Sequence, residues 1–218
     1  MNYYNMHLLT SEPIHSYCEQ YSSAESEALY ELSRQTHLKT ELPVMLSGHL
    51  QGRVLSMISH MLKPVYILEI GTFTGYSAIC LAEGLAENGQ LITIDVNEEM
   101  SELCQTFFEK SGQADKIRLL IGKAADIIPT LDMEFDLVFI DADKSNYSHY
   151  FDLVIEKVKK GGFILADNVL FHGEVLEPET ASKNAKAMHA YNQKSMNDAR
   201  VECVLLPIRD GIMISRKK

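Results

Sequence analysis

From residue 65 onward, short apolar runs alternate with longer segments of helical periodicity. The apolar runs predict strands near 65–70, 91–95, 117–121, 135–140 and 162–166. The segments between them repeat apolar residues every three or four positions and predict helices near 75–86, 97–111, 124–130 and 146–159. This alternation is typical of a mostly parallel sheet with helices on both faces and right-handed crossovers. The predicted fold class is therefore α/β.

The residues before this region follow a different pattern. Residues 11–62 show helical spacing without a convincing strand. Ser11 is the predicted N-cap of a first helix, and Ser22 or Ser23 that of a second. A third helix is expected to end at Pro64. Together these segments predict a helical cap in front of the α/β core.

The end of the chain predicts an antiparallel addition to the sheet. A helical segment near 180–195 is followed by two apolar runs, VECVLLPI and GIMIS, with Arg209 and Asp210 between them. The dipeptide Asp210-Gly211 is a hairpin signal. We therefore expect a hairpin to close the parallel sheet.

The stretch LEIGTFTGYSA, Leu68 to Ala78, has the layout of strand, glycine turn and helix. Glycines at 71 and 75 allow a sharp turn and a close approach of the backbone to a ligand. Asp95 ends the next apolar run about 20 residues further on, which is where an acidic residue holds a ribose. A tight turn without a ligand is the structural alternative. The glycine spacing lacks G-x-G-x-x-G, which opposes an NAD-dependent oxidoreductase.

Acidic residues also end the other strands predicted near this turn. Asp141 follows the run FDLVFI, and Asp167 with Asn168 follows GGFILA. Because the carboxyl ends of parallel strands meet at one edge, these groups would repel one another unless cations or hydrogen-bond donors intervene. Two carboxylates and an amide oxygen suit magnesium, manganese or calcium better than zinc. A helix cap or Asx turn at Asp167 is the structural alternative.

Four motifs carry a resemblance to known enzymes. Glu69 to Ser77 reads E-I-G-T-x-x-G-Y-S, which resembles motif I of the S-adenosylmethionine-dependent methyltransferases. The motifs D-A-D-K-x-x-Y from Asp141, A-D-N-x-L from Ala166 and M-x-S-x-x-x-Q-G from Met45 are similar to those of the metal-dependent O-methyltransferases, the caffeoyl-coenzyme A and catechol family. The resemblance extends from about Pro13 to Arg216. It implies a Rossmann-like methyltransferase fold with a seven-stranded sheet.

The resemblance also implies roles for particular residues. The residues expected to hold S-adenosylmethionine are Met45, Glu69, Gly71, Thr72, Ser77, Asp95, Ala124 and Asp141. Those expected to bind a divalent cation, magnesium first and manganese or calcium as alternatives, are Asp141, Asp167 and Asn168. Lys144 is the expected general base, and Asp143 is expected only to orient Lys144 or cap the next helix. The segment 171–184 is expected to line the acceptor site, with Phe171 where many relatives have tryptophan.

The implied activity is metal-dependent methylation of a hydroxyl group on a catechol-like small molecule or a hydroxycinnamoyl-coenzyme A thioester. Methylation of a hydroxylated uridine in transfer RNA is an alternative substrate for the same chemistry. A binding module that has lost activity is opposed by the intact Asp141, Lys144, Asp167 and Asn168. Relatives are often dimeric, and the apolar faces within residues 11–62 favour a homodimer.

Composition narrows these possibilities further. The formal net charge of −10 makes nucleic-acid binding unexpected, because such surfaces are usually basic. Four cysteines without C-x-x-C spacing, no apolar run that could span a membrane and no secretory signal point to the cytoplasm. No internal repeat or interdomain linker is visible. We therefore expect one methyltransferase domain over residues 1–218, with the helical cap at 11–62 and the cofactor-binding core at 63–218.

Overall fold

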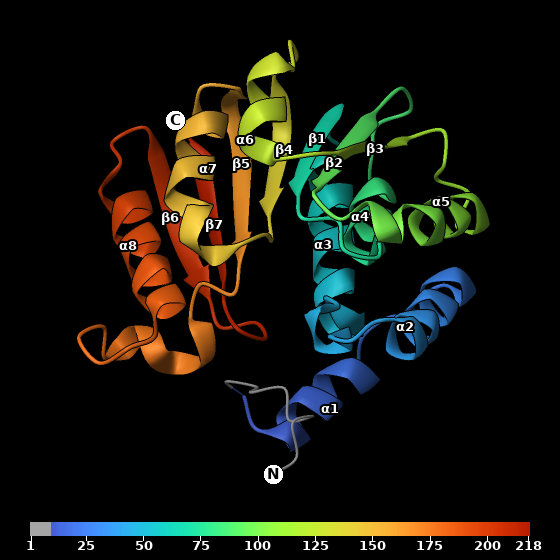
Figure 1. Ribbon diagram of the computed structural model, residues 1–218, viewed down its shortest axis with the longest axis horizontal. Helices are drawn as coiled ribbons and strands as arrows, with labels where there is room; N and C mark the ends of the chain where they lie inside the picture. Colours follow the sequence, from blue (N-terminus) through green and yellow to red (C-terminus); the bar gives the residue numbers. More distant parts are fainter. Residues whose placement is uncertain (1–9) are drawn as a thin grey trace.

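A computed structural model describes residues 10–218. Within this range one sheet contains seven strands in the order β3-β2-β1-β4-β5-β7-β6. The strands are β1 (Tyr66–Ile70), β2 (Gln90–Asp95), β3 (Ile117–Ile121), β4 (Phe135–Ile140), β5 (Val158–Asp167), β6 (Val201–Leu206) and β7 (Ile212–Lys217). The first five are parallel, and β7 runs antiparallel between β5 and β6. This confirms the predicted α/β class and the closing hairpin (Figure 1).

Helices surround this sheet. The α-helices are α1 (Glu12–Gln20), α2 (Glu27–Lys39), α3 (Gly48–Leu62), α4 (Tyr76–Ala82), α5 (Ser101–Lys110), α6 (Ala124–Ile127), α7 (Tyr147–Ile155) and α8 (Lys183–Asn197). Short 3-10 segments are η1 (Pro43–Met45), η2 (Glu98–Met100), η3 (Ile128–Thr130), η4 (Lys144–Asn146) and η5 (Phe171–Leu176). The helical character predicted for 11–62 is therefore confirmed from residue 12 onward.

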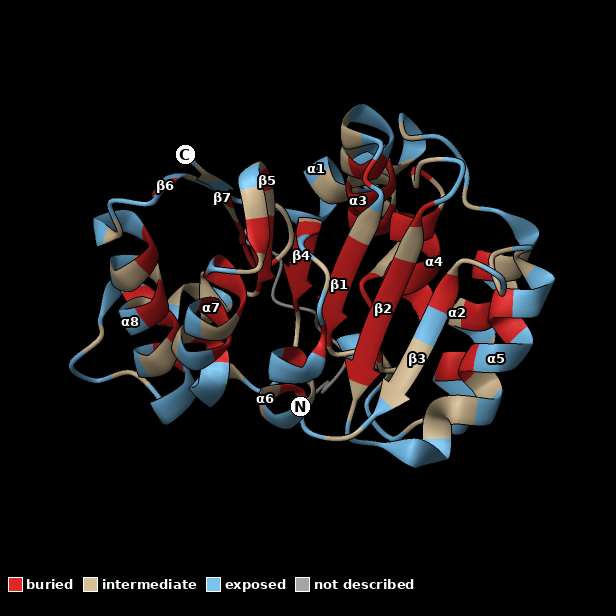
Figure 2. Ribbon diagram, turned by 90° about the horizontal axis from the view of Figure 1, so that it is seen from above, coloured by how far each residue is buried: buried red, intermediate tan, exposed pale blue. Residues whose placement is uncertain are grey.

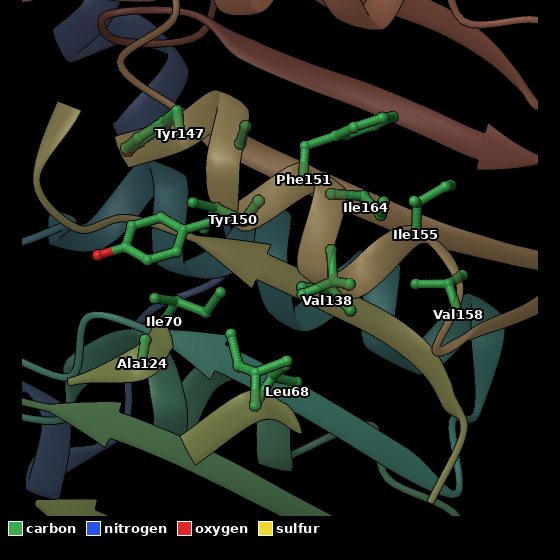
Figure 3. Close-up of a cluster of buried hydrophobic side chains, with 14 of the residues drawn as sticks. Leu68, Ile70, Ala124, Val138, Tyr147, Tyr150, Phe151, Ile155, Val158 and Ile164 are labelled. Atoms are coloured by element: carbon green, nitrogen blue, oxygen red, sulfur yellow. The ribbon is translucent and has the colours of Figure 1, made fainter. Parts of the chain in front are cut away.

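Two apolar cores lie on opposite faces of the sheet because alternate strand residues point to opposite sides. Helices α6, α7 and α8 cover one face, where Phe151 lies beside strand residues such as Val138 and Ile164 (Figure 3). Tyr191 of α8 belongs to the same core. Helices α2 to α5 cover the other face, where Leu55 and Phe108 are fully buried. The central strands are buried along most of their length (Figure 2). This burial on both faces explains why their sequences read as continuous apolar runs.

Four local predictions about element ends were wrong. The helix expected near 146–159 ends at Ile155, because the chain joins the sheet at Val158. The N-cap of α2 is Ser26, whose hydroxyl accepts from the Leu29 N–H at 3.3 Å, and not Ser22 or Ser23. Helix α4 ends at Ala82 and not near residue 86, because the chain at Gly84 passes against the backbone of α3. Strand β5 begins at Val158, four residues earlier than residue 162, since it pairs with β4 across an irregularity in register.

Two further predictions concern the membrane and the amino terminus. None of the helices within residues 10–218 combines the length and apolar character needed to cross a bilayer. The prediction that there is no secretory signal depends largely on residues 1–9, which lie outside the described range. It stays a prediction.

Candidate active site

The carboxyl ends of the central parallel strands open into one cavity of about 1020 Å³. All the predicted site residues except Glu69 line it: Met45, Gly71, Thr72, Ser77, Asp95, Ala124, Asp141, Lys144, Asp167 and Asn168. The cavity is at the upper end of the usual range for small-molecule sites. The residues that the motifs singled out therefore face one shared space, which can hold a large ligand together with a smaller one.

The glycine turn is held against the end of β4. Gly71 has φ +101°, and a Cβ added there would lie 1.9 Å from the Asp141 carbonyl oxygen. Gly75 has φ +90°, and a Cβ there would meet the Phe108 ring at 2.7 Å. Both positions thus require glycine for its backbone freedom and its lack of a side chain. The close approach at Gly71 places the predicted cofactor turn directly beside Asp141.

Asp95 supports this turn through its carboxylate. Oδ2 accepts from the backbone N–H groups of Thr72 at 2.9 Å and Phe73 at 2.8 Å, and Oδ1 accepts from Asn97 N–H at 2.9 Å. The N–H of Thr72, a residue expected to hold S-adenosylmethionine, is therefore already bonded to Asp95. A carboxylate offers about four acceptor positions. Asp95 thus retains the capacity to accept from ribose hydroxyls as well.

Glu69 lies beneath the turn and does not line the cavity. It is fully buried, and the Thr93 hydroxyl donates to its Oε2 at 2.6 Å. The Thr72 hydroxyl in turn lies 2.5 Å from that of Thr93. Burial raises the pKa of Glu69 to about 8, which favours the neutral form of the side chain. This geometry makes Glu69 a support of the turn, and direct contact with a cofactor stays a prediction.

Lys144 is held at the cavity wall by two oxygens. Its Nζ donates to Asp141 Oδ1 at 2.9 Å and to the Tyr147 hydroxyl at 2.7 Å. Burial and the nearby carboxylates raise the pKa of Tyr147 well above its usual value, so the hydroxyl remains protonated. Asp143 instead accepts from Asn146 Nδ2 at 2.6 Å and the Tyr150 hydroxyl at 2.5 Å. Asp143 therefore fixes the start of α7, whereas the Lys144 ammonium group bonds to Asp141 and Tyr147.

Asp167 is a buried carboxylate with both oxygens bonded. Gln51 Nε2 donates to Oδ2 at 2.7 Å, and the Asn168 N–H donates to Oδ1 at 2.8 Å. Burial, followed by the negative charge of Asp141, raises the pKa of Asp167 above its usual value. The charges of Arg209 and Lys144 act in the opposite direction. Two carboxylates thus share a region where added positive charge would stabilise both.

The donor set at this point fits a hard divalent cation. Asp141, Asp167 and Asn168 line the same cavity and offer only oxygen side-chain ligands. Among residues 10–218, no group of three or more His, Cys, Asp or Glu side chains is placed to hold a metal ion. The set formed by Asp141, Asp167 and Asn168 differs from such a group, because it contains only two carboxylates and its third ligand is an amide oxygen. Its binding of a cation is a proposal that follows from the chemistry of the donors.

The predicted acceptor segment reaches the cavity through Phe171, His172 and Asn184. Phe171 and His172 have positive φ values of 41° and 57°, and their rings lie 5.3 Å apart. The buried Asp210 accepts from the His172 N–H at 2.6 Å, and its Oδ2 lies 3.5 Å from His172 Nδ1. The hairpin loop between β6 and β7 therefore holds this segment beside the cavity.

Two residues at the site were missed from the sequence. Gln51 on α3 contacts Asp167, and Arg209 in the β6–β7 loop contacts Gln51. Gln51 lies within the M-x-S-x-x-x-Q-G motif, which was the one available signal. The spacing carried no indication that the amide points toward a strand end 116 residues later.

Comparison with known proteins gives a consistent result. A family model described as O-methyltransferase matches residues 19–218. Caffeoyl-CoA O-methyltransferase of Eucalyptus gunnii is 34% identical, over 96% of this chain and 89% of that protein. A probable caffeoyl-CoA O-methyltransferase of Dictyostelium discoideum is 32% identical, over 98% and 95%.

Solved structures share the fold over nearly the whole chain. The SAH-bound methyltransferase PaMTH1 of Podospora anserina superposes with a TM-score of 0.88 at 30% identity, covering 95% of this chain and 94% of that one. An O-methyltransferase from Bacillus cereus in complex with SAH gives a TM-score of 0.87 at 26% identity, covering 94% and 97%.

Proposed function

Because this chain belongs to the O-methyltransferase family, we propose that it transfers the methyl group of S-adenosylmethionine to a phenolic hydroxyl, with the aid of a divalent cation. The proposed acceptor is a catechol-like small molecule or a hydroxycinnamoyl-coenzyme A thioester. One observation carries the proposal: the glycine turn, Lys144 and the Asp141–Asp167 pair face the same cavity. A methyl donor, an acceptor oxygen and a base can therefore meet there.

The cofactor assignment is supported by the turn and by the structural relatives. PaMTH1 and the Bacillus cereus enzyme were both solved with SAH, the product form of the donor. We place the nucleoside beside Asp95 and Ala124 and the methionine end near Gly71 and Ser77, all of which line the cavity. Met45, which is 54% exposed, would cover the cofactor from the η1 side.

The proposed reaction is an in-line displacement at the sulfonium methyl group. A phenolic oxygen forms the new O–C bond, while the S–C bond breaks and its electron pair returns to sulfur. The proton of the hydroxyl goes to Nζ of Lys144, which must be neutral to receive it. Tyr147 and Asp141 position Nζ at the cavity wall. The products are the methyl ether and S-adenosylhomocysteine.

The proposed cation would be held by Asp141, Asp167 and Asn168. When bound there, it would stabilise the negative charge of the phenolate and fix the position of the acceptor. Asp141 also borders the glycine turn through its carbonyl, so the same residue would serve both the cation and the cofactor turn.

The acceptor class follows from the relatives and the cavity. The named relatives are caffeoyl-CoA O-methyltransferases, which favours a hydroxylated aromatic ring. Phe171 supplies an aromatic wall on the acceptor side. No observation on the described residues favours the transfer-RNA alternative. The test is a methyl-transfer screen over catechols, coenzyme A thioesters and RNA, with and without magnesium; methylation of RNA alone would contradict the proposed acceptor.

We predict that Asp95→Ala weakens S-adenosylmethionine binding by about 1–3 kcal/mol, the usual range for a lost hydrogen bond to a charged group. The alanine removes the proposed acceptor for the ribose and releases the N–H groups of Thr72 and Phe73. Calorimetric titration with S-adenosylmethionine, and with NAD as the control ligand, measures the change. Asp95→Asn keeps one oxygen that can accept from the turn, so it should lose less affinity for S-adenosylmethionine than Asp95→Ala does. An unchanged affinity for Asp95→Ala would contradict the ribose assignment.

We also predict a homodimer that buries the exposed side of the amino-terminal helices. Helix α1 has no buried residue; Tyr17 on it and Tyr21 at its C-cap are 60% and 72% exposed. Met57 and Met61 on α3 are likewise 60% and 70% exposed. Aromatic residues and methionine are enriched at protein interfaces. Light scattering at micromolar concentration should give twice the mass of one chain, and Met57→Glu should shift it toward the monomer; a monomeric parent protein would refute the prediction.

A further inference from the structure

We propose that Gln51 and Arg209 are positioning residues that fix the carboxylate of Asp167 for cation binding. The proposal rests on the proposed function, because it assumes that Asp167 is a cation ligand. Neither residue contacts the expected reacting atoms. They act through one chain of hydrogen bonds, buried at Gln51 and half-buried at Arg209, that joins the β6–β7 loop, helix α3 and the end of β5.

The chemistry of the three groups determines which way the Gln51 amide points. Arg209 Nη1 donates to Gln51 Oε1 at 3.2 Å, and a guanidinium has no acceptor. The amide oxygen must therefore face Arg209, which leaves the NH₂ group toward Asp167. That group donates to Asp167 Oδ2 at 2.7 Å, and an ionised carboxylate can only accept. Both ends thus specify the same orientation, and Gln51 is fully buried in it.

Arg209 is itself fixed by the backbone of the helical cap. Its Nη1 also donates to the Ser47 carbonyl at 2.6 Å, and its Nη2 donates to the Val44 carbonyl at 3.4 Å. These bonds tie the loop between β6 and β7 to the segment Val44–Ser47, which forms a wall of the cavity. Arg209 therefore joins the cofactor side of the site to the side that holds Asp167.

The outcome is a carboxylate with little freedom to rotate. Gln51 holds Oδ2, and the Asn168 N–H holds Oδ1 at 2.8 Å. A carboxylate oxygen has further lone pairs, and those of Asp167 remain for a ligand in the cavity. If the Gln51 donor is removed, Oδ2 loses its fixed direction. Changing a partner that orients a metal ligand typically lowers metal affinity about 10–100-fold.

The experiment measures Mn²⁺ binding directly, without turnover, by electron paramagnetic resonance of the free ion in a titration of the purified protein. We expect Gln51→Met to weaken Mn²⁺ binding about 10–100-fold. Arg209→Lys keeps the positive charge near Asp167 but lacks the planar group that holds both Gln51 and the backbone of the helical cap. It should weaken Mn²⁺ binding less than Gln51→Met does, and the double variant should match Gln51→Met, because the amide is then already absent. The affinity of Gln51→Met for S-adenosylmethionine should equal that of the parent protein. A general loosening of the fold would lower that affinity as well.

Arg53→Met is the matched control. Arg53 lies on the same helix but binds Glu83, with Nη1 to Oε2 at 3.0 Å. Its replacement loosens α3 without touching Asp167, so Mn²⁺ affinity should stay at the parent value. A melting curve for each variant reports whether it is folded. If Gln51→Met does not fold, Gln51→Asn decides, because it keeps an amide at this position but its side chain is one carbon shorter, which draws the donor away from Asp167 Oδ2.

The outcomes separate this inference from the proposed function. Asp167→Asn is the reference that removes the ligand charge. If it loses Mn²⁺ binding while the Gln51 variants bind like the parent, the positioning role is overturned and the cation site stands. If Arg53→Met weakens binding as much as Gln51→Met, the effect is structural and the inference is also overturned. If the parent protein does not bind Mn²⁺, both the inference and the proposed cation site fail.

Discussion

Replacement of Lys144 by methionine is expected to lower kcat by about 10²–10⁴-fold, the usual contribution of a positioned acid or base. Methionine keeps the length of the side chain but cannot receive the phenolic proton. The affinity for S-adenosylmethionine should change little, because Nζ contacts Asp141 and Tyr147 and lies outside the turn formed by Gly71 and Gly75. Steady-state rates together with a calorimetric titration separate the two effects.

The pH dependence of the Lys144 variant provides a sharper test. A phenol ionises near pH 10, so raising the pH should supply phenolate without a base and recover part of the lost rate. Lys159→Met is the matched control, since Lys159 forms an ion pair with Asp136 at 2.7 Å and does not line the cavity. It should retain the parent kcat. A Lys144→Met enzyme with the parent kcat would show that proton transfer does not involve this residue.

Removal of divalent cations by a chelator is expected to reduce methylation of a catechol by at least about 10²-fold. A bound cation contributes several kcal/mol to charge stabilisation, and each 1.4 kcal/mol corresponds to about a factor of ten. Asp141, Asp167 and Asn168 supply three side-chain ligands, whereas magnesium prefers six. Two adjacent oxygens of a catechol can fill open positions, which a single hydroxyl cannot do. A catechol should therefore react far faster than the matching monophenol.

The rate comparison is made with a catechol and its monophenol, before chelation, after chelation and after magnesium is restored. Asp141→Ala and Asp167→Ala should lose activity in all conditions while their circular dichroism remains that of the parent. Restored magnesium should recover the parent enzyme but neither variant. Equal rates for the two acceptors, or full activity in chelator, would contradict the role assigned to the cation.

Sequence periodicity predicted most of the fold because buried parallel strands must be apolar throughout. All five strands expected before the hairpin were found, and the Asp210-Gly211 signal correctly placed the turn. Errors arose where several residues carry the same local sequence signal and a tertiary contact determines which of them has the predicted role. Three serines precede α2, and the bond between the Tyr76 hydroxyl and Glu25 fixes the chain just before Ser26. No local pattern distinguishes that serine from its neighbours.

The part of the candidate site that could be predicted from the sequence consists of the residues at the carboxyl ends of the parallel strands. The positions of Asp95, Asp141 and Asp167 follow from parallel strands that all end at one edge. The contacts of Gln51 and Arg209 could not be read in this way, because they are 158 residues apart and on elements of different kinds. Likewise, Glu69 stood at the expected strand end, but the pleat of the strand directs it under the turn and away from the cavity.

The position of β7 between β5 and β6 has a consequence for the order of assembly. β6 pairs with β7 in this sheet and not with β5, so it has no place in the sheet until β7 has been inserted. β1 likewise pairs with β4, from which it is separated by two intervening strands in the chain. Such non-local pairings require loop closure before they bring any stabilisation. Asp167 ends β5, and Arg209 lies between β6 and β7. The hydrogen bonds from Arg209 through Gln51 to Asp167 are therefore complete only after the hairpin has docked on β5. A partly folded chain would have the acidic strand ends but not these bonds.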